Sequence, residues 1–480
     1  MMTTNAEQRP KPAPRVIPHF TVKERVNQGK AARTNCPRSG HAAWEPAPDR
    51  PDPITLLEAQ ASTRIPELVP IRYGRMLVSP FAFYRGAAAI MASDLSTMPN
   101  TELQVQLCGD AHISNFGGFA SPERELLLDV NDFDETLPGP WEWDVKRLIA
   151  SVEIAGREQG FSVKTLHKLV YGVVGEYHRA MREFAAMSNL DLWYLHLNQA
   201  EMQARWGQEA KTKAMKAIDA SFTPVHHRDN QRAFEKLTRR VDGEIRIAPR
   251  PPLIIPIEDL VPDKEQDQIE ESMRGILRNY RSNLRDDHRH LLESYRYVHM
   301  ARKVVGVGSV GTHNWIVLLL GRDDADPLFI QVKEAQASVL EPYPGKSTYA
   351  EHGQRVVEGQ WLMQASSDIF LGWKNANGFD GISRDFYFRQ LWDWKISVDV
   401  EVMKPDELMV YGKVCAWTLA RAHARSGDRV AIDAYLGKSD ITDKALAEFA
   451  VAYANQNERD YQALVAAVKS GRIKAETVTQ

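Results

Sequence analysis

The spacing of apolar residues divides the chain into blocks that favour helices and blocks that favour strands. Apolar positions recur at i, i+3, i+4 and i+7 over much of the sequence, which is the periodicity of an amphipathic helix. The predicted helical blocks are residues 142–157, 162–245, 264–300 and 407–480. A short apolar run at 124–131 instead predicts a buried strand.

Strand patterns gather after residue 300. The predicted strands are 302–307, 312–320, 328–333 and 386–391, with a helix over 348–365. The third strand alternates, because successive side chains of a strand point to opposite faces. Its two faces carry Leu328, Ile330 and Val332, and Phe329, Gln331 and Lys333. Separate helix-rich and strand-rich blocks predict an α+β fold with a large helical lobe and a small β-rich lobe.

Composition and charge exclude several classes of protein. The 480 residues are 43% hydrophobic and 26% charged, and the net charge is −3. A nucleic-acid-binding protein would usually be basic, and no apolar run reaches the roughly 20 residues that cross a bilayer. Three widely separated cysteines suggest reduced thiols. We therefore expect a cytoplasmic protein that binds neither nucleic acid nor membranes.

The first 53 residues differ from the rest of the chain. They are rich in proline and charge and show no apolar periodicity, which predicts a mostly disordered arm. They also lack the apolar core of a signal peptide.

A cluster of acidic and amide residues lies between positions 109 and 144. Asp110 and Asn115 are five residues apart in a segment that contains glycines, and Asp132 and Asp134 follow the predicted buried strand. On an extended chain, residues i and i+2 point to the same side. Together these side chains offer the hard oxygen ligands that Mg²⁺ requires when it is bound with substrate phosphates.

A second cluster lies between two predicted strands and contains Gly306, Gly308, Ser309 and Gly311. The spacing G-x-G-x-x-G is weak evidence alone, because the dinucleotide-binding fingerprint shares it. That fingerprint needs a helix directly after the last glycine, whereas here a strand follows. A glycine loop between two strands favours the loop that kinases lay over ATP phosphates.

Lys333 ends the third predicted strand, where kinases carry the lysine that holds the α- and β-phosphates. Such a lysine needs a glutamate partner on the next helix, and Glu351 and Glu358 are the candidates. Thr348-x-x-Glu351 has the spacing of a capping box, which would explain Glu351 locally. Glu358 is therefore the predicted partner of Lys333.

In their order and spacing, the residues between 109 and 144 resemble the aminoglycoside phosphotransferase and choline kinase branch of protein-kinase-like enzymes. That branch has a Gly-Asp-x-x-x-x-Asn loop, then a strand ending in a metal-binding Asp, then an Asp that opens a helix. The resemblance implies that Asp110 is the catalytic base and that Asn115 and Asp132 hold Mg²⁺. It also implies that Asp144 braces the catalytic loop.

Some assignments within this resemblance stay open. Asp134 or Asp129 could replace Asp132 as the metal ligand, and Cys108 stands where the branch commonly has His. On the nucleotide side, the resemblance implies that ATP phosphates are held by Lys333 and the glycine loop, that is by Gly306, Gly308, Ser309 and Gly311.

The motifs run in a different order from that of kinases, because the catalytic and metal loops precede the glycine loop and the lysine. We infer a circularly permuted kinase-like fold, since contacts rather than chain order make a site. The expected segments are the arm at 1–53, a large-lobe segment with the catalytic and metal loops at 54–160, a helical segment and candidate acceptor region at 161–300, a small nucleotide-binding lobe at 301–395 and large-lobe helices at 396–480. An unpermuted alternative starts at His423 but lacks a downstream Asn and metal Asp.

Residues 70–465 also resemble an uncharacterised bacterial family catalogued as domain of unknown function 2252, which gives no substrate. The cues are residues 83–86, 109–147, 306–340, 353–360 and 419–427. The expected function is an ATP- and Mg²⁺-dependent phosphotransferase that acts on an unidentified hydroxyl-bearing acceptor. The alternatives are AMP transfer on the same fold, and a catalytically inactive kinase-like protein that senses nucleotides or acts as a scaffold. The oligomeric state is not predicted.

Overall fold

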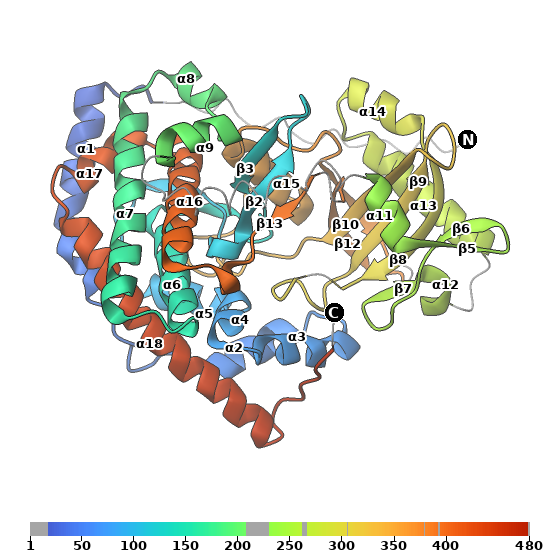
Figure 1. The fold of residues 1–480 in the computed structure, drawn as a ribbon, viewed down its shortest axis with the longest axis horizontal. Coiled ribbons are helices and arrows are strands. Elements are labelled where there is room, and N and C mark those ends of the chain that lie inside the picture. Colours follow the sequence, from blue (N-terminus) through green and yellow to red (C-terminus); the bar gives the residue numbers. More distant parts are fainter. Residues whose placement is uncertain are drawn as a thin grey trace, which may run out of the picture.

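Helices and strands occupy different ends of the molecule. The computed structural model describes residues 18–207, 230–261, 266–304, 306–378, 380–391 and 394–478. Long helices gather at one end and a six-stranded sheet lies at the other, with a small three-stranded sheet between them (Figure 1). The expected mixed α+β class is confirmed.

The helical end is built around α6, α7, α16 and α18, whose apolar faces meet in one core. On α6, Val145, Leu148, Ile149 and Val152 are buried, as their helical spacing predicts. The helices are α1 (Val22–Asn35), α2 (Pro53–Ala61), α3 (Val69–Met76), α4 (Pro80–Arg85), α5 (Ala88–Ser96), α6 (Glu142–Glu158), α7 (Val163–Ala186), α8 (Asn189–Tyr194), α9 (Gln199–Trp206), α11 (Asn230–Leu237), α12 (Ile257–Leu260), α13 (Gln266–Arg281), α14 (Asp286–Glu293), α15 (His352–Met363), α16 (Pro405–Ser426), α17 (Arg429–Leu436) and α18 (Ile441–Lys469).

The six-stranded sheet is antiparallel throughout and has the order β11-β12-β10-β9-β8-β7. Its strands are β7 (Ile254–Pro256), β8 (Arg296–Lys303), β9 (Asn314–Leu320), β10 (Pro327–Glu334), β11 (Gly372–Asn377) and β12 (Ser383–Gln390). Helix α15 connects β10 to β11 and packs against β11 and β12. The glycine-containing segment predicted from the sequence is the connection between β8 and β9.

The predicted alternation of β10 is confirmed. Leu328, Ile330 and Val332 join the apolar cluster beneath α13, whereas Phe329 joins a different cluster. Gln331 and Lys333 therefore lie on the face away from α13, where they pair in register with Arg389 and Tyr387 of β12.

Two smaller sheets position the loops that follow them. The three-stranded sheet has the order β13-β2-β3, and a separate pair joins β1 to β4. These strands are β1 (Gln104–Leu107), β2 (Phe116–Ala120), β3 (Leu126–Val130), β4 (Leu137–Pro140) and β13 (Ile396–Ser397). Gly117 allows β13 to approach β2 closely, because a Cβ there would lie 2.4 Å from the carbonyl oxygen of Ile396. The predicted buried strand corresponds to β3.

The expectation of a disordered N-terminal arm is wrong for residues 18–53. Thr21 and Glu24 form a capping box that starts α1, and Arg33 donates hydrogen bonds to main-chain oxygens near the end of α17. Polar side chains make these contacts, so the segment docks without the apolar periodicity that sequence analysis relies on. Residues 1–17 lie outside the described part of the chain.

Two predicted helical blocks contain strands. Residues 238–247 form a hairpin of β5 (Thr238–Val241) and β6 (Glu244–Ile247), and β8 begins at Arg296 within the block predicted as helical. The hairpin had a local signal, because Asp242 and Gly243 adopt positive φ angles of 52° and 84° and Asp-Gly favours such tight turns. Residues 208–229 and 262–265 of the predicted helical blocks lie outside the described residues.

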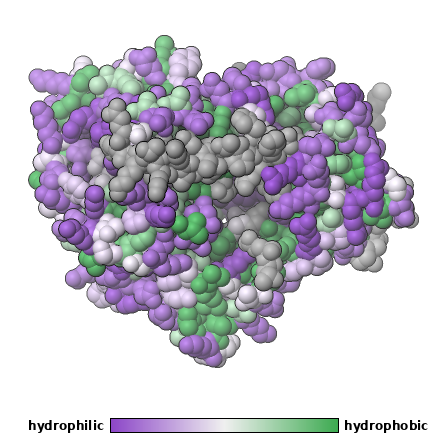
Figure 2. Space-filling model, viewed as in Figure 1, coloured by the Kyte–Doolittle hydropathy of each residue, from purple (hydrophilic) through white to green (hydrophobic). Residues whose placement is uncertain are grey.

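The face of the molecule shown in Figure 2 is largely polar where its residues are described. Hydrophilic side chains cover most of the face shown in Figure 2, and apolar residues are scattered among them. Among the helices that the structure describes, none combines the length and the apolar character needed to cross a membrane.

Candidate functional site

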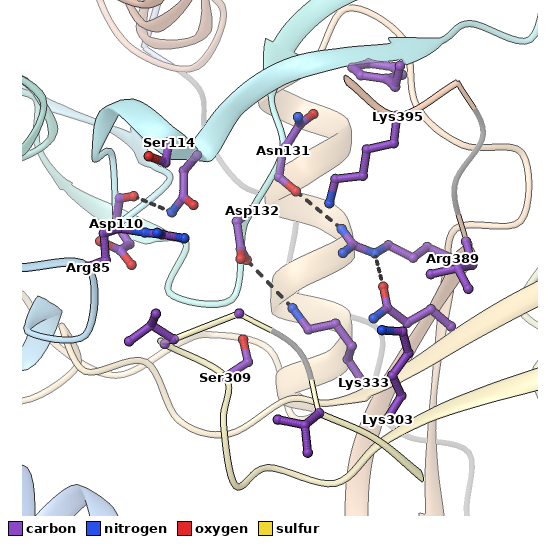
Figure 3. Close-up of a pocket in the computed structure, with 18 of the residues that line it drawn as sticks. Arg85, Asp110, Ser114, Asn131, Asp132, Lys303, Ser309, Lys333, Arg389 and Lys395 are labelled. Carbon is purple, nitrogen blue, oxygen red and sulfur yellow. Dashed lines mark hydrogen bonds and ion pairs between the residues drawn. The ribbon is translucent and has the colours of Figure 1, made fainter. Parts of the chain in front are cut away.

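A cavity of about 750 Å³ lies between the six-stranded sheet and the loops around β2 and β3 (Figure 3). Its lining comes from segments that are distant in the sequence. The first predicted cluster contributes Asp110, Asn115 and Asp132, and the second contributes Gly306, Gly308, Ser309 and Lys333. The two sets of motifs therefore face one cavity.

The loop that carries Asp110 is fastened to α6. One carboxylate oxygen of Asp144 accepts a hydrogen bond from the backbone N–H of Cys108 at 2.8 Å, and the other accepts one from Gly109 at 3.1 Å. His423 lies 3.2 Å from the same carboxylate. Asn115 donates its side-chain N–H to the carbonyl oxygen of Asp110 at 2.7 Å. Asp144 thus braces the loop from the start of a helix, as expected.

The carboxylate of Asp110 lies beside two arginines. Arg147 contacts it at 2.8 Å, and Arg85 lies next to it on the cavity wall (Figure 3). Burial raises the pKa of Asp110 to about 6, although Arg147 opposes the shift. Burial and the two arginines hold the pKa of His112, 3.8 Å away, well below its ordinary value. Asp110 is therefore a carboxyl group poised near neutral pH, which suits a proton acceptor.

Asp134 is tied to the six-stranded sheet. Lys333 Nζ lies 2.6 Å from one of its oxygens, Ser309 donates its hydroxyl to the same oxygen at 3.1 Å, and Tyr387 donates to the other at 2.6 Å. These contacts outweigh burial and lower the pKa of Asp134 to about 2. Burial opposes the charge of Lys333, but the carboxylates of Asp132 and Asp134 outweigh it and raise the pKa of Lys333. Asp134 is therefore a permanent counter-ion of Lys333.

Of the three candidate aspartates, Asp132 is the one that lines the cavity. Its side chain is 34% exposed and lies 3.9 Å from Lys333 Nζ. Asp129 is buried and forms a 2.5 Å ion pair with Arg421, which gives it a structural role.

The donor set of the cavity fits Mg²⁺ only in part. Asn115 and Asp132 both line it, and Mg²⁺ is typically held by one or two carboxylates together with water and substrate phosphates. The described residues contain no group of three or more His, Cys, Asp or Glu side chains that could hold a metal without such help. A metal ion bound here would therefore depend on additional oxygen atoms from a bound substrate or from water.

The glycine segment forms part of the cavity wall. Gly306, Gly308 and Ser309 line it, and no described atom lies within 4 Å of a Cβ built at Gly306. Gly311 instead packs against Arg64 and has φ +92°, a conformation that favours glycine. Its carbonyl oxygen accepts a hydrogen bond from the N–H of Ile65 at 2.7 Å. The backbone conformation of the loop at position 311 therefore requires glycine.

The predicted pairing of Lys333 with Glu358 is wrong. Lys333 is already neutralised by Asp134, and the half-buried Glu358 accepts a 3.5 Å hydrogen bond from Gln354. Helix α15 lines the cavity with Gln360. Its Arg355 lies beside the cavity and donates to the carbonyl oxygens of Asp134, Thr136 and Gln336. The helix thus holds the backbone next to Asp134 rather than the lysine itself.

Sequence analysis missed most of the positive charge in the cavity. The Lys and Arg residues that line it are Arg75, Arg85, Lys236, Arg250, Lys303, Lys333, Arg389 and Lys395. Of these, only Lys333 was predicted. Strand alternation could have found Arg389, because it shares a face with Tyr387 and pairs in register with Gln331.

The fold and the cavity together define a mixed α+β protein with a polar, cation-rich site fastened by buried ion pairs. Residues 64–467 match the family described as "uncharacterized protein conserved in bacteria (DUF2252)", and the chain belongs to this family. No curated protein and no solved structure matches the chain.

Proposed function

We propose that the protein is an ATP- and Mg²⁺-dependent phosphotransferase with a circularly permuted kinase-like fold, acting on a hydroxyl-bearing acceptor. One observation carries the proposal. Asp110, Asn115 and Asp132 line the same cavity as the glycine segment and Lys333, although about 200 residues separate the two groups. Kinases likewise place a glycine loop before a strand lysine, opposite a catalytic Asp and metal ligands.

Each residue then has a defined task. Lys333 and the backbone around Gly306, Gly308 and Ser309 bind the phosphates of ATP, whose negative charge the ammonium group offsets. Asn115 and Asp132 would hold Mg²⁺, which neutralises charge on the β- and γ-phosphates when it is bound.

The transfer step uses Asp110. Its carboxylate accepts a hydrogen bond from the acceptor hydroxyl and takes its proton as the hydroxyl oxygen bonds to the γ-phosphorus. The bond from that phosphorus to the β–γ bridging oxygen breaks, and ADP leaves with the bonding electron pair. Positioning and charge stabilisation supply most of the rate in such reactions.

The test is nucleotide binding to the full-length protein, measured by calorimetry with ATP in the presence and absence of Mg²⁺. We expect Mg²⁺-dependent binding that weakens at least tenfold in Lys333→Met and in Asp132→Asn. Lys346→Met and Asp286→Asn, which change exposed side chains elsewhere, are the matched controls and should bind like the wild type.

Two outcomes would contradict the proposal: no nucleotide binding by the wild type, or unchanged binding by both cavity variants. Asp110→Asn should bind Mg·ATP normally and transfer nothing. Mass analysis of a modified acceptor separates addition of phosphate from addition of AMP. Nucleotide binding without transfer across acceptor panels would favour the inactive, nucleotide-sensing alternative.

A further inference from the structure

The cavity carries a second group of cations at some distance from Asp110. Arg389 comes from β12, Lys303 from the end of β8, and Lys395 from the segment just before β13. In Figure 3 these side chains lie on the far side of Asp132 from Asp110, and Lys303 and Lys395 extend toward Arg389 from two sides. Three chain segments therefore direct positive charge into one part of the cavity.

The register of the sheet separates this group from Lys333. The last pair between β8 and β9 joins Arg302 to Trp315, so the next residue of β8, Lys303, lies opposite Asn314. Asn314 in turn pairs with Lys333 of β10. Strands two apart in a sheet are separated by roughly 10 Å. Lys333 Nζ is held 2.6 Å from Asp134, so Lys303 and Lys333 leave the sheet at separate points and each can contact a different anionic group.

Burial opposes the charge of Arg389, but Tyr387 and the carboxylates of Asp132, Asp134 and Asp368 outweigh burial and raise its pKa. Arg389 is oriented by two neutral acceptors, the side-chain oxygen of Gln331 at 2.9 Å and the carbonyl oxygen of Asn131 at 3.3 Å. Among the described residues, none forms an ion pair with Lys303 within 4.0 Å. Among the residues that the structure describes, the cavity wall has eight Lys and Arg residues against five acidic ones, Asp110, Asp132, Asp368, Asp399 and Glu401.

The cations also repel one another. Burial and the neighbouring Arg389, Lys333 and Lys303 lower the pKa of Lys395 to about 8, and Asp132 offsets this only in part. The pKa of Lys303 is lowered by burial and by Lys236, Arg75 and Arg250. A bound anion would relieve this repulsion, since opposite charges stabilise each other strongly where water is partly excluded.

We propose that Lys303, Arg389 and Lys395 form a second oxyanion site, which binds a phosphate group separate from the phosphates held at Lys333. A guanidinium flanked by two ammonium groups matches the charge and the acceptor oxygens of a phosphate. This inference rests on the proposed function for the role of Lys333 and extends it, because it makes the ligand multiply anionic. The second phosphate belongs either to a phosphorylated acceptor or to a nucleotide phosphorylated outside its triphosphate chain.

The test uses inorganic pyrophosphate as the probe and the full-length protein without added metal. Calorimetry should show binding by the wild type. The double variant Lys303→Met/Lys395→Met should bind at least tenfold more weakly and show a smaller dependence on salt, since fewer charges are neutralised. Lys346→Met is the matched control, and circular dichroism checks that each variant is folded. No binding to the wild type, or equal affinities for the wild type and the double variant, would overturn the proposal.

A second arm identifies the source of the phosphate. Pyrophosphate is titrated into protein saturated with Mg²⁺ and a non-hydrolysable ATP analogue. Binding that persists and still needs Lys303 and Lys395 assigns the site to the acceptor. Displacement by the analogue, together with weaker analogue binding by the double variant, assigns it to the nucleotide.

The anion site and the phosphotransferase can fail separately. Pyrophosphate binding that depends on Lys303 and Lys395, in a protein that does not bind Mg·ATP, would keep the anion site and reject the phosphotransferase. The reverse pattern, with Mg·ATP binding lost in Lys333→Met and pyrophosphate binding indifferent to the double variant, would reject the anion site alone.

Discussion

The carboxylate of Asp110 is subject to two opposing influences, burial and the guanidinium of Arg147. Burial prevails, so the folded protein retains a proton there up to about pH 6, whereas the ordinary value is 3.8. Between these values the unfolded chain binds fewer protons than the folded protein. The contribution of Asp110 to the free energy of unfolding therefore falls as the pH rises from about 4 to 6. A shift of two units corresponds to about 3 kcal/mol.

Asp110→Asn should remove this part of the pH dependence. We expect the free energy of unfolding of the wild type, relative to that of the variant, to decrease across this window and to level off above about pH 6. Urea denaturation at half-unit intervals of pH measures it, with Asp286→Asn as a control that follows the wild type. Parallel curves for the wild type and Asp110→Asn would show that Asp110 titrates near its ordinary value.

Single residues also show which features of the site cannot be predicted from the sequence. The motif placed Asp110, Asn115 and the aspartates after β3 correctly in one region, because their spacing carries that information. It could not distinguish Asp132 from Asp134, since both approach Lys333 and only the surroundings separate them. Ser309 and Tyr387 make Asp134 a counter-ion, and both come from segments more than 170 residues further along the chain.

At the scale of elements, α15 couples the six-stranded sheet to the loop after β3. Arg355 is buried and its guanidinium donates to three carbonyl oxygens. Arg355→Met would leave those acceptors without their donor, and we expect a loss of about 2–4 kcal/mol in the free energy of unfolding. Glu358→Gln, one turn later on the same helix, should change it by less than about 0.5 kcal/mol.

Urea denaturation of the two variants checks this assignment, and Mg·ATP binding provides a second measurement. A variant at Glu358 that is strongly destabilised, or that loses nucleotide binding while Arg355→Met retains it, would restore the pairing expected from kinases. The sequence pattern predicts helix α15. Which of its side chains contacts the backbone around Asp134 depends on how the helix packs against β1, β11 and β12.

Elements with strong local patterns were predicted well. Strands β9 and β10 follow their apolar runs, and the two faces of β10 separate as alternation requires. Short elements were missed where tertiary pairing decides the conformation. Strand β11 has the sequence Gly-Trp-Lys-Asn-Ala-Asn, which has little strand preference, and it exists through its register with β12.

At the scale of the whole molecule, residues near the N-terminus hold distant helices together. Arg50 bridges two buried carboxylates, Asp94 of α5 and Asp460 of α18, with contacts of 2.6–2.9 Å to each. Tyr453 donates its hydroxyl to Asp94 as well. Such long-range polar contacts leave no periodic pattern, which is why sequence analysis predicts a disordered arm where residues 18–53 instead dock on the helices.

Removing Arg50 should therefore be costly in a pH-dependent way. Arg50→Ala leaves two buried carboxylates without their counter-ion, and we expect a loss of about 3–5 kcal/mol at pH 8. Burial already raises the pKa of Asp460, and without the arginine it rises further. Protonation at lower pH then removes the unpaired charge, so the loss should shrink toward pH 5.

The comparison needs an exposed arginine with the same kind of partners. Arg472 contacts Asp52 and Glu58 with 44% of its side chain exposed, and Arg472→Ala should lower the free energy of unfolding far less than Arg50→Ala does at pH 8. Chemical denaturation of both variants at pH 5 and pH 8 makes the measurement. An equal loss at both pH values for Arg50→Ala would mean that the arginine stabilises by packing. If only Arg50→Ala regains free energy of unfolding at pH 5, the positive charge of Arg50 holds the two ends of the chain together.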